Sequence, residues 1–229
     1  MSVRGLLLRR ADGLPPGQRE VREFPRFSDK PLRWAPRSTP IEFTVSVEGN
    51  EVRRFDAVDV AAFERVEQVS DFHCVTTWTH RDVRWGGVRF RDVVRSAIDG
   101  ALPTHLVAHA SDGHSAMFVA DDLLGDHLGK AVLLATELDG EPLDRRHGAP
   151  VRLVSPGQYG YKNVKHLIGV DFCEVEPTST LGPKEHLRAR VELEERHATL
   201  PNWLLRVPYR LTVVPTALAA ERGLRKSPE

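Results

Sequence analysis

Residues 41–55 read Ile-Glu-Phe-Thr-Val-Ser-Val-Glu-Gly-Asn-Glu-Val-Arg-Arg-Phe, a pattern on which the choice of fold class rests. From residue 41 to residue 47 apolar side chains alternate with polar ones, which is the period of a strand with one buried face. Glu48-Gly49-Asn50 has the composition of a turn, and a second strand-like segment follows at 52–55. The stretch therefore predicts a β-hairpin.

Short helices and further strands are expected on the C-terminal side of this hairpin. Asp59 is predicted to cap a helix at 60–65, and the apolar spacing at 88–98 predicts a second helix. Strand-like segments lie at 66–72, 105–110, 115–119, 131–138, 151–154 and about 165–175. Because strands are interleaved with few helices, we predict a single α+β domain with a mixed β-sheet core and flanking short helices, and not a doubly wound sheet.

Three parts of the chain differ in composition. Residues 1–40 are rich in Arg and Pro without periodicity, as expected of an N-terminal segment that wraps over a domain and gains order by docking on it. Residues 41–176 contain the strand and helix patterns and form the predicted core. Residues 177–229 form a predicted C-terminal extension with a helix packed on that core.

The helix of this extension is expected at 185–197, where the sequence is highly charged. Leu187, Val191 and Glu194 would share one face of such a helix. The charged residues between Glu192 and Arg196 are then expected to form a solvated helix face.

Bulk composition excludes several classes of protein. Lys plus Arg and Asp plus Glu each number 32, so the net charge predicts no nucleic-acid partner and no attraction to anionic membranes. No run of about 18 apolar residues is present, so no membrane span is expected. Arg9-Arg10 resembles the start of a twin-arginine export signal, but the apolar stretch that should follow is replaced by polar and turn-forming residues. We therefore expect a cytoplasmic protein.

The chain has two cysteines, Cys74 and Cys173, without CxxC spacing, which excludes a disulfide scaffold and a zinc site built from thiolates. A lone cysteine is more often a small buried hydrophobe than a ligand. Cys173 lies in an alternating strand pattern, and we assign it no role. Cys74 differs because it follows a predicted strand and has His73 on one side and Thr76 on the other, so that its thiolate could bind a soft metal or an electrophile.

A second candidate region lies at 147–165 and combines glycines with fixed or titratable cations. It contains His-Gly-Ala-Pro-Val-Arg at 147–152 and Pro-Gly-Gln-Tyr-Gly-Tyr-Lys-Asn-Val-Lys at 156–165. Glycines let a backbone approach a ligand closely, while Arg and Lys bind phosphate. The region could therefore hold an anionic cofactor tail, or it could be a turn-rich surface with solvated charges. It is neither a Walker loop nor a dinucleotide fingerprint.

Two other sites can be drawn from the same residue types. His105 and His109 share a strand face and could bind a metal together with Asp112, although a strand histidine is more often packed or exposed. Cys74 and His73 could form a nucleophilic pair in a thiol hydrolase. Adjacent residues of a strand point to opposite faces, which disfavours that pair.

Three segments together resemble a known family. Asp71-Phe72-His73-Cys74-Val75-Thr76-Thr77-Trp78, with Trp85-Gly86-Gly87 after it, resembles the metal-ligand segment of the sulfite oxidase family of molybdopterin enzymes. Residues 147–154 and 160–167 resemble the two pterin-binding stretches of that family, in the family's order. The resemblance covers about residues 40–176. It implies a sulfite-oxidase-type fold and a molybdenum-pyranopterin cofactor.

The resemblance also implies roles for individual residues. Cys74 would be the metal ligand and the catalytic residue, and His147, Arg152, Asn163 and Lys165 would contact the pterin and its phosphate. Lys162 would be a basic neighbour of the cofactor. Ser111 matches a hydroxyl residue of the family by strand alignment alone. The family's N-terminal cofactor-gripping segment has no clear counterpart. Phe24-Pro25-Arg26-Phe27 occupies its region without being the same motif, and Arg26 is the candidate there.

The implied reaction is a two-electron oxygen-atom transfer, either the oxidation of a substrate such as sulfite or the reduction of an S-oxide or N-oxide. The substrate would be a small molecule, and electrons would be exchanged with a separate electron-transfer protein. An alternative is a molybdopterin-binding subunit or carrier without its own turnover. A thiol hydrolase without metal is a third reading.

Overall fold

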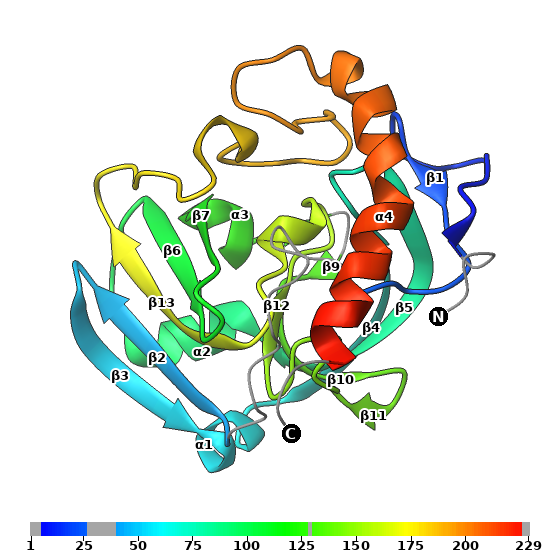
Figure 1. Ribbon diagram of the computed structural model, residues 1–229. Helices are drawn as coiled ribbons and strands as arrows, with labels where there is room; N and C mark the ends of the chain where they lie inside the picture. Colours follow the sequence, from blue (N-terminus) through cyan, green and yellow to red (C-terminus); the bar gives the residue numbers. More distant parts are fainter. Residues whose placement is uncertain (1–5, 27–39, 128–129, 226–229) are drawn as a thin grey trace.

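The computed structural model describes residues 6–26, 40–127 and 130–225, and two β-sheets form its centre (Figure 1). In the first, sheet A, the order is β1-β5-β10-β11, with β4 paired to β5 and β12 paired to β10. Its strands are β1 (Arg19–Glu20), β4 (Arg65–His73), β5 (Trp78–Arg89), β10 (Leu133–Leu138), β11 (Glu141–Pro142) and β12 (Arg152–Val154). β1 runs parallel to β5, whereas the other pairs are antiparallel.

The second sheet, sheet B, has the order β3-β2-β13-β6-β7. Its strands are β2 (Glu42–Val47), β3 (Asn50–Asp56), β6 (His105–Ala110), β7 (Ser115–Val119) and β13 (Leu167–Cys173). Here β2 and β13 are parallel and the other pairs antiparallel. A separate short pair consists of β8 (Asp126–His127) and β9 (Lys130–Ala131). Both large sheets are therefore mixed, which confirms the predicted α+β class.

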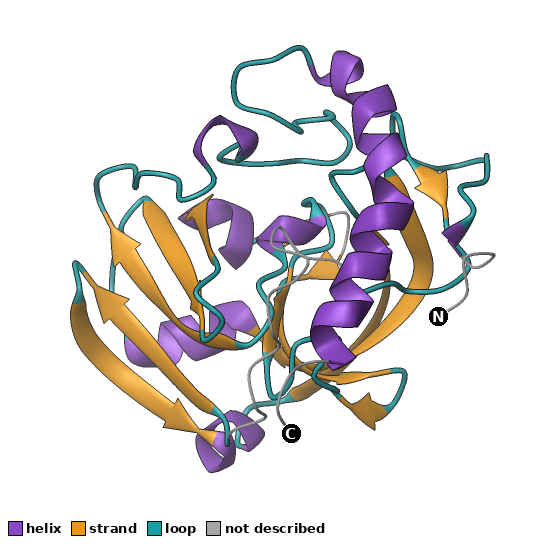
Figure 2. Cartoon of the chain, in the orientation of Figure 1, coloured by secondary structure: helices purple, strands orange, loops and turns teal. Residues whose placement is uncertain are grey.

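Most helices are short and flank the sheets, while one long helix, α4, lies across sheet A (Figure 2). The helices are α1 (Ala57–Ala61), α2 (Phe90–Ala97), α3 (Ala120–Leu124) and α4 (Arg206–Arg225), with 3-10 helices η2 (Gly160–Lys162), η3 (Gly182–Lys184) and η4 (Asn202–Leu205). None of the helices in the described part of the chain has the length and apolarity needed to cross a membrane.

Two apolar clusters hold these layers together. The larger joins sheet B to α2 and to one face of sheet A, with Phe43, Phe90 and Leu134 among its buried members. The smaller contains Cys74 and the indole of Trp85, and it also includes Val213 of α4. Burial of apolar surface contributes about 25 cal/mol per Å² to the stability of the fold. Because Val213 is buried in the cluster that encloses Cys74, this cluster holds α4 on sheet A.

The predicted hairpin is confirmed as β2 and β3, with Glu48 and Gly49 at positive φ in the turn. The first helix begins earlier than predicted. Its cap is Asp56, whose side chain accepts hydrogen bonds from two backbone N–H groups, while Asp59 is the third residue of the helix and bonds back to the N–H of Asp56. This capping box moves the helix start from residue 60 to residue 57.

Strand β5 is not predicted by the apolar pattern, because charged residues interrupt its first half and four consecutive residues from Trp85 to Val88 are all buried. Such a run has no alternation. A Cβ atom on Gly87 would lie 2.1 Å from the carbonyl oxygen of Leu134. Glycine is thus required here for the close approach of β5 and β10.

The helix predicted at 185–197 is wrong. This segment is a series of turns, with Ala189 and Glu194 at positive φ, and its charged residues Glu185 and Arg196 are buried rather than solvated. Tertiary ion pairs override the helical pattern here. The long helix of the extension is α4 instead, whose internal Pro215 conceals it in the sequence. The predicted division into 1–40, 41–176 and 177–229 stays a prediction, and residues 27–39 of its first part lie outside the described residues.

Candidate functional site

Strand β4 delivers Cys74 to a tight turn that leads into β5. The N–H of Cys74 donates to the carbonyl of Trp78 at 2.8 Å, and the N–H of Thr77 donates back to the carbonyl of Cys74 at 3.1 Å. Gln18 also donates its side-chain amide to that carbonyl at 3.1 Å. The thiol is therefore held by a backbone whose hydrogen bonds are satisfied, which fixes its position.

The Cys74 thiol is buried and has cationic neighbours. Burial raises its pKa, while a hydrogen bond with Thr76 and the positive charges of Arg196 and Lys165 act in the opposite direction. The Sγ atom lies 3.1 Å from the Thr76 hydroxyl. A soft metal cation would favour the thiolate, since metal binding displaces the thiol proton.

Arg152 is fully buried on β12, and the chemistry of the site depends strongly on it. Its guanidinium donates to the carbonyls of His147 at 2.8 Å and Asn163 at 3.0 Å, and it lies over the ring of Trp85 at 4.9 Å. Within the described residues it forms no ion pair with a carboxylate, and its Nε has no hydrogen-bond partner. Burial lowers the pKa of Arg152 to about 9, so it stays cationic at neutral pH. A buried cation of this kind favours an anionic ligand.

His147 provides a second buried nitrogen beside Arg152. Its Nδ1 bonds to Asp144 at 2.9 Å, and within the described residues its buried Nε2 has no hydrogen-bond partner. Burial lowers the pKa of His147 although Asp144 opposes the shift, and Lys165 and Arg152 lower it further. The ring is therefore neutral at pH 7, with Asp144 fixing its orientation and Nε2 left as an acceptor.

Lys165 completes the cationic group. Its ammonium donates to the carbonyl of Arg146 at 2.7 Å. Burial lowers its pKa well below the ordinary value, and the charges of Arg152 and Arg26 add to this. Gly148, at φ +106, packs against Lys165 so closely that a Cβ atom there would lie 2.8 Å from the lysine Cβ. Arg26, the residue that the sequence suggested in the N-terminal region, therefore lies within electrostatic reach of Lys165.

The remaining predicted site residues make other contacts. Asn163 bonds through its amide to the backbone of the 155–159 loop, including the N–H of Ser155 at 2.9 Å. Lys162 is fully buried and pairs with Glu185 at 2.8 Å. The side chains of Asn163 and Lys162 thus hold protein segments together. Arg152 and Lys165, by contrast, form no ion pair with a carboxylate within the described residues.

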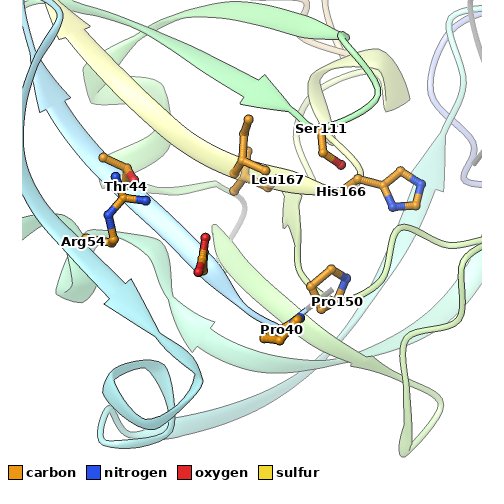
Figure 3. Close-up of a pocket in the computed structure, with 9 residues that line it drawn as sticks. Pro40, Thr44, Arg54, Ser111, Pro150, His166 and Leu167 are labelled. Carbon is orange, nitrogen blue, oxygen red and sulfur yellow. The ribbon is translucent and has the colours of Figure 1, made fainter. Parts of the chain in front are cut away.

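Ser111 is exposed, and within the described residues its backbone contact is to the segment around His166 and not to the charged groups themselves. Its N–H donates to the carbonyl of His166 at 2.9 Å. Figure 3 shows Ser111 and His166 on one side of a cavity of about 270 Å³, with Thr44 and Arg54 on the other. The serine hydroxyl therefore faces a surface cavity of sheet B.

Two residues near Cys74 were not predicted. Arg196 is fully buried, donates to the carbonyls of Val75 and Pro16, and lies 4.9 Å from the ring of Tyr159. Burial raises the pKa of Tyr159 to about 12 against the charge of Arg196, and the charge of Cys74 also acts on it. Tyr159 thus keeps its proton at neutral pH. In the sequence, the Tyr-Gly-Tyr of the second basic segment could have indicated Tyr159 as a site residue. Arg196 lies in a charged run that resembles a solvated surface, so no such indication exists for it.

The histidine metal site is not supported. Among the residues that the structure describes, no group of three or more His, Cys, Asp or Glu side chains could hold a metal ion, and this includes His105, His109 and Asp112. The Cys74–His73 pair is not supported either. His73 Nδ1 bonds to the hydroxyl of Thr79 at 2.9 Å, and burial lowers its pKa to about 4.

The site fits an anionic, sulfur-ligated metal cofactor. It offers one soft thiol, Cys74, and beside it a buried arginine and a buried histidine, each with an unpartnered nitrogen among the described residues. Thiolates select soft metals. The cationic group would neutralise phosphate, and the pterin ring would be held by the remaining polar groups.

Comparison with known proteins gives curated relatives and a solved structure. The chain is 38% identical over 116 residues to the uncharacterized oxidoreductase YuiH of Bacillus subtilis, covering 51% of this chain and 57% of the relative. It is 26% identical over 185 residues to the protein-methionine-sulfoxide reductase catalytic subunit MsrP of Gluconobacter oxydans, covering 72% and 58%. The chain thus spans little more than half the length of these relatives.

The sulfane dehydrogenase SoxCD from Paracoccus pantotrophus has a similar fold, with a TM-score of 0.53 and 18% identity. This match covers 76% of the chain and 48% of that structure. The family described as "oxidoreductase molybdopterin binding domain" matches residues 33–181. That span is more than half of the chain and contains Cys74, His147, Arg152 and Lys165, whereas Arg26 lies before it. The chain therefore belongs to the oxidoreductase molybdopterin-binding domain family, the sulfite-oxidase-type molybdopterin proteins that the three segments resemble.

Proposed function

We propose that this protein is a molybdenum-cofactor-dependent oxidoreductase that carries out two-electron oxygen-atom transfer, with Cys74 as the protein ligand to the metal. The observation that carries the proposal is a buried, rigidly held thiol within electrostatic reach of Lys165, on which the charges of Arg152 and Arg26 act in turn. When bound, the cofactor supplies molybdenum that cycles between Mo(VI) and Mo(IV), and the protein supplies position and local charge.

Each residue of the site has a proposed part in this reaction. Arg152 and Lys165 bind the anionic tail of the pterin, and His147 accepts through Nε2 a hydrogen bond donated by an N–H group of the pterin ring. Asn163 and Lys162 act through the protein by fixing the loop and the 3-10 helix that precede Lys165. Cys74 would bind the metal and tune its electronic properties.

Ser111 and Arg26 are proposed for the outer part of the cofactor site. Ser111 is linked to the group through the backbone of His166, the neighbour of Lys165 in sequence. Arg26 donates to the carbonyl of Ala220 at 2.5 Å, and its charge acts on Lys165. Both would contact the cofactor at its edge and not at the metal.

A substrate with a sulfur-bound oxygen fits this site. The relatives include a protein named for methionine-sulfoxide reduction, and the similar structure is named a sulfane dehydrogenase. Near Cys74 the cations Arg196 and Lys165 would favour an anionic or strongly polar oxygen. Tyr159, protonated at neutral pH, could donate a proton or hydrogen bond to that oxygen.

The test uses two cysteine variants expressed in cells that make the cofactor. Cys74→Ser should lose turnover with sulfite as donor, or with dimethyl sulfoxide as acceptor, in assays coupled to a redox dye, because the metal loses its only protein thiolate. Cys173→Ser is the matched control and should be unaffected. Molybdenum per protein is measured for each by elemental analysis. Unchanged turnover of Cys74→Ser would overturn the proposal.

The same measurements separate the alternatives. A carrier would contain molybdenum and show no turnover with either substrate, although the dye itself reacts with the metal. A thiol hydrolase would contain no molybdenum and would be inactivated by alkylation of Cys74.

A further inference from the structure

An exposed apolar stripe runs along η4 and the first turns of α4. Trp203, Val207 and Leu211 follow one another at intervals of four residues and are 63%, 62% and 75% exposed, and Leu204 beside them is 50% exposed. Residues four apart lie on one face of a helix. Large apolar side chains that gather on one surface mark an interaction site, whereas single scattered ones do not.

The opposite face of α4 makes the contacts that hold the helix on the domain. Val213, Ala217 and Ala220 are fully buried and recur at the same helical spacing. Val213 belongs to the apolar cluster that contains Cys74. The exposed stripe is therefore not needed to keep α4 in place.

Arginines border the stripe. Arg206 pairs with Glu194 at 2.5 Å. Burial lowers the pKa of Arg210, and so do the charges of Arg19, Arg196 and Arg206, which lie within electrostatic reach of it. The charges that act most strongly on Arg210 are positive, so this border would attract an acidic surface.

The inner side of α4 lies close to the Cys74 loop. Tyr209, on α4 between the two arginines, lies close enough to Cys74 and Arg196 for their charges to act on its hydroxyl. Arg196 in turn donates to the carbonyl of Val75, the residue after Cys74. Tyr209 is two residues from both Val207 and Leu211 and lies on the opposite side of the helix, so a protein bound on the stripe would be separated from the metal ligand by the thickness of α4.

We propose that a docking face, made of Trp203, Leu204, Val207 and Leu211 with the bordering Arg206 and Arg210, binds an acidic one-electron carrier protein. The inference rests on the proposed function and names its redox partner by chemistry. When a substrate gains an oxygen atom from water, two protons and two electrons are released, and the electrons pass singly to two oxidised carriers. Reduction of an S-oxide consumes two protons and two electrons from two reduced carriers, and releases water.

The residue composition of the docking face favours a protein, and not a lipid surface, as its partner. Trp and Arg are the residues that dominate binding energy in protein interfaces. The apolar stripe covers only about two turns of helix, and the carboxylate of Glu194 stands at its border. Anionic lipid would be attracted by the arginines but would meet little apolar surface to insert.

The experiment measures the affinity of the loaded protein for an acidic plant-type [2Fe–2S] ferredoxin at low and at physiological ionic strength. Wild type should bind, and more weakly as salt rises. The double variant Val207→Ser, Leu211→Ser should lose at least about tenfold in affinity, and Arg210→Glu should lose affinity most at low salt. The control Val58→Ser, Val175→Ser removes two exposed side chains, 77% and 79% exposed, in α1 and just after β13, and should bind as wild type does.

Turnover with a small redox dye keeps the two proposals apart. All of these variants should retain molybdenum and dye-coupled turnover, since none lies in the cofactor site. Absence of molybdenum from wild type would defeat the proposed function. The docking face itself would be disproved by unchanged ferredoxin affinity in the stripe variant, or by binding of phosphatidylglycerol vesicles without binding of ferredoxin.

Discussion

Two regions bury charged side chains, and they satisfy them in opposite ways. In the cofactor segment, residues 144–165, the guanidinium of Arg152 bonds only to backbone carbonyls and lies over aromatic rings. In the arm, residues 177–205, Glu185 pairs with Lys162, and Glu194 pairs with Arg196 and Arg206. The positive charge of Arg152 in the cofactor segment is available to a ligand, whereas the charged side chains of the arm form ion pairs that hold the protein together.

Lys162 links the two regions, because it comes from the cofactor segment and pairs with the arm. Its ammonium donates to Glu185 and to the carbonyl of Met117, and the other oxygen of Glu185 accepts from Ser179 at 2.6 Å. A buried pair of this kind is strongly destabilising when one partner is removed. Lys162 and Arg152 are thus two fully buried cations of one segment that should respond differently to the same substitution.

The largest effect is expected for Lys162→Met. Burial lowers the pKa of Lys162 to about 8, and the lysine is still mostly charged at pH 7. Its removal leaves the Glu185 carboxylate buried without its cation. We expect the free energy of unfolding to fall by about 3–5 kcal/mol, as measured by urea denaturation at pH 7.

The double variant Lys162→Met, Glu185→Leu is the matched control for this pair. With both charges gone, most of the lost stability should return, since apolar residues of similar volume replace a buried ion pair at little net cost. Equal destabilisation in the single and double variants would mean that the ion pair does not hold the arm.

A smaller change in stability is expected for Arg152→Met. The variant loses two hydrogen bonds to carbonyls, but it also removes a desolvated cation that has no carboxylate partner among the described residues. These effects oppose each other, so the cofactor-free protein should change by no more than about 1–2 kcal/mol. Its molybdenum content should nevertheless fall at least about tenfold, because the anionic tail loses its buried counter-charge.

Urea denaturation of the cofactor-free protein and elemental analysis of the protein made with cofactor check the two halves of this prediction separately. Arg152→Lys keeps the charge and should retain more molybdenum than Arg152→Met does. Full molybdenum content in Arg152→Met would remove Arg152 from the cofactor site and end the contrast between the two regions.

The sequence predicts the fold where one local pattern decides an element. The 41–55 hairpin and the helix near 88–98 have such patterns, and both are present. β5 lacks one, because residues distant in sequence bury both of its faces, with Val88 in the larger apolar cluster and Trp85 in the smaller. The segment 185–197 has a helical pattern, but its ion pairs with distant residues such as Lys162 determine its conformation.

The same distinction between local sequence patterns and long-range contacts applies to the residues of the site. Cys74, His147, Arg152 and Lys165 are grouped through the three segments that resemble the family. Lys165 lies within electrostatic reach of Cys74, Arg152 and His147, and the role of these residues in holding a cofactor stays a prediction. Arg196 could not be assigned to the site from the sequence, because its part depends on contacts with Val75 and Pro16, more than 100 positions away. A buried arginine that reaches across the fold leaves no pattern in its neighbours.

The smallest effect is expected for Asp144→Asn in the cofactor segment. Burial opposes the shift, but hydrogen bonds from the side chain and backbone of His147 lower the pKa of Asp144 from 3.8 to about 2. Because the folded pKa is the lower one, this carboxylate stabilises the protein above about pH 4, and that stability is lost as the pH falls towards 2. The side chain is 59% exposed, so solvent screening limits the contribution to less than about 1 kcal/mol. Unfolding free energies of wild type and Asp144→Asn should therefore differ at pH 7 and converge near pH 2, while Asp99→Asn, the same change at an exposed loop position, should show no such convergence. A difference that grows as the pH falls would mean that His147 is not oriented by the Asp144 carboxylate, and that its Nε2 is directed towards the cofactor by other contacts.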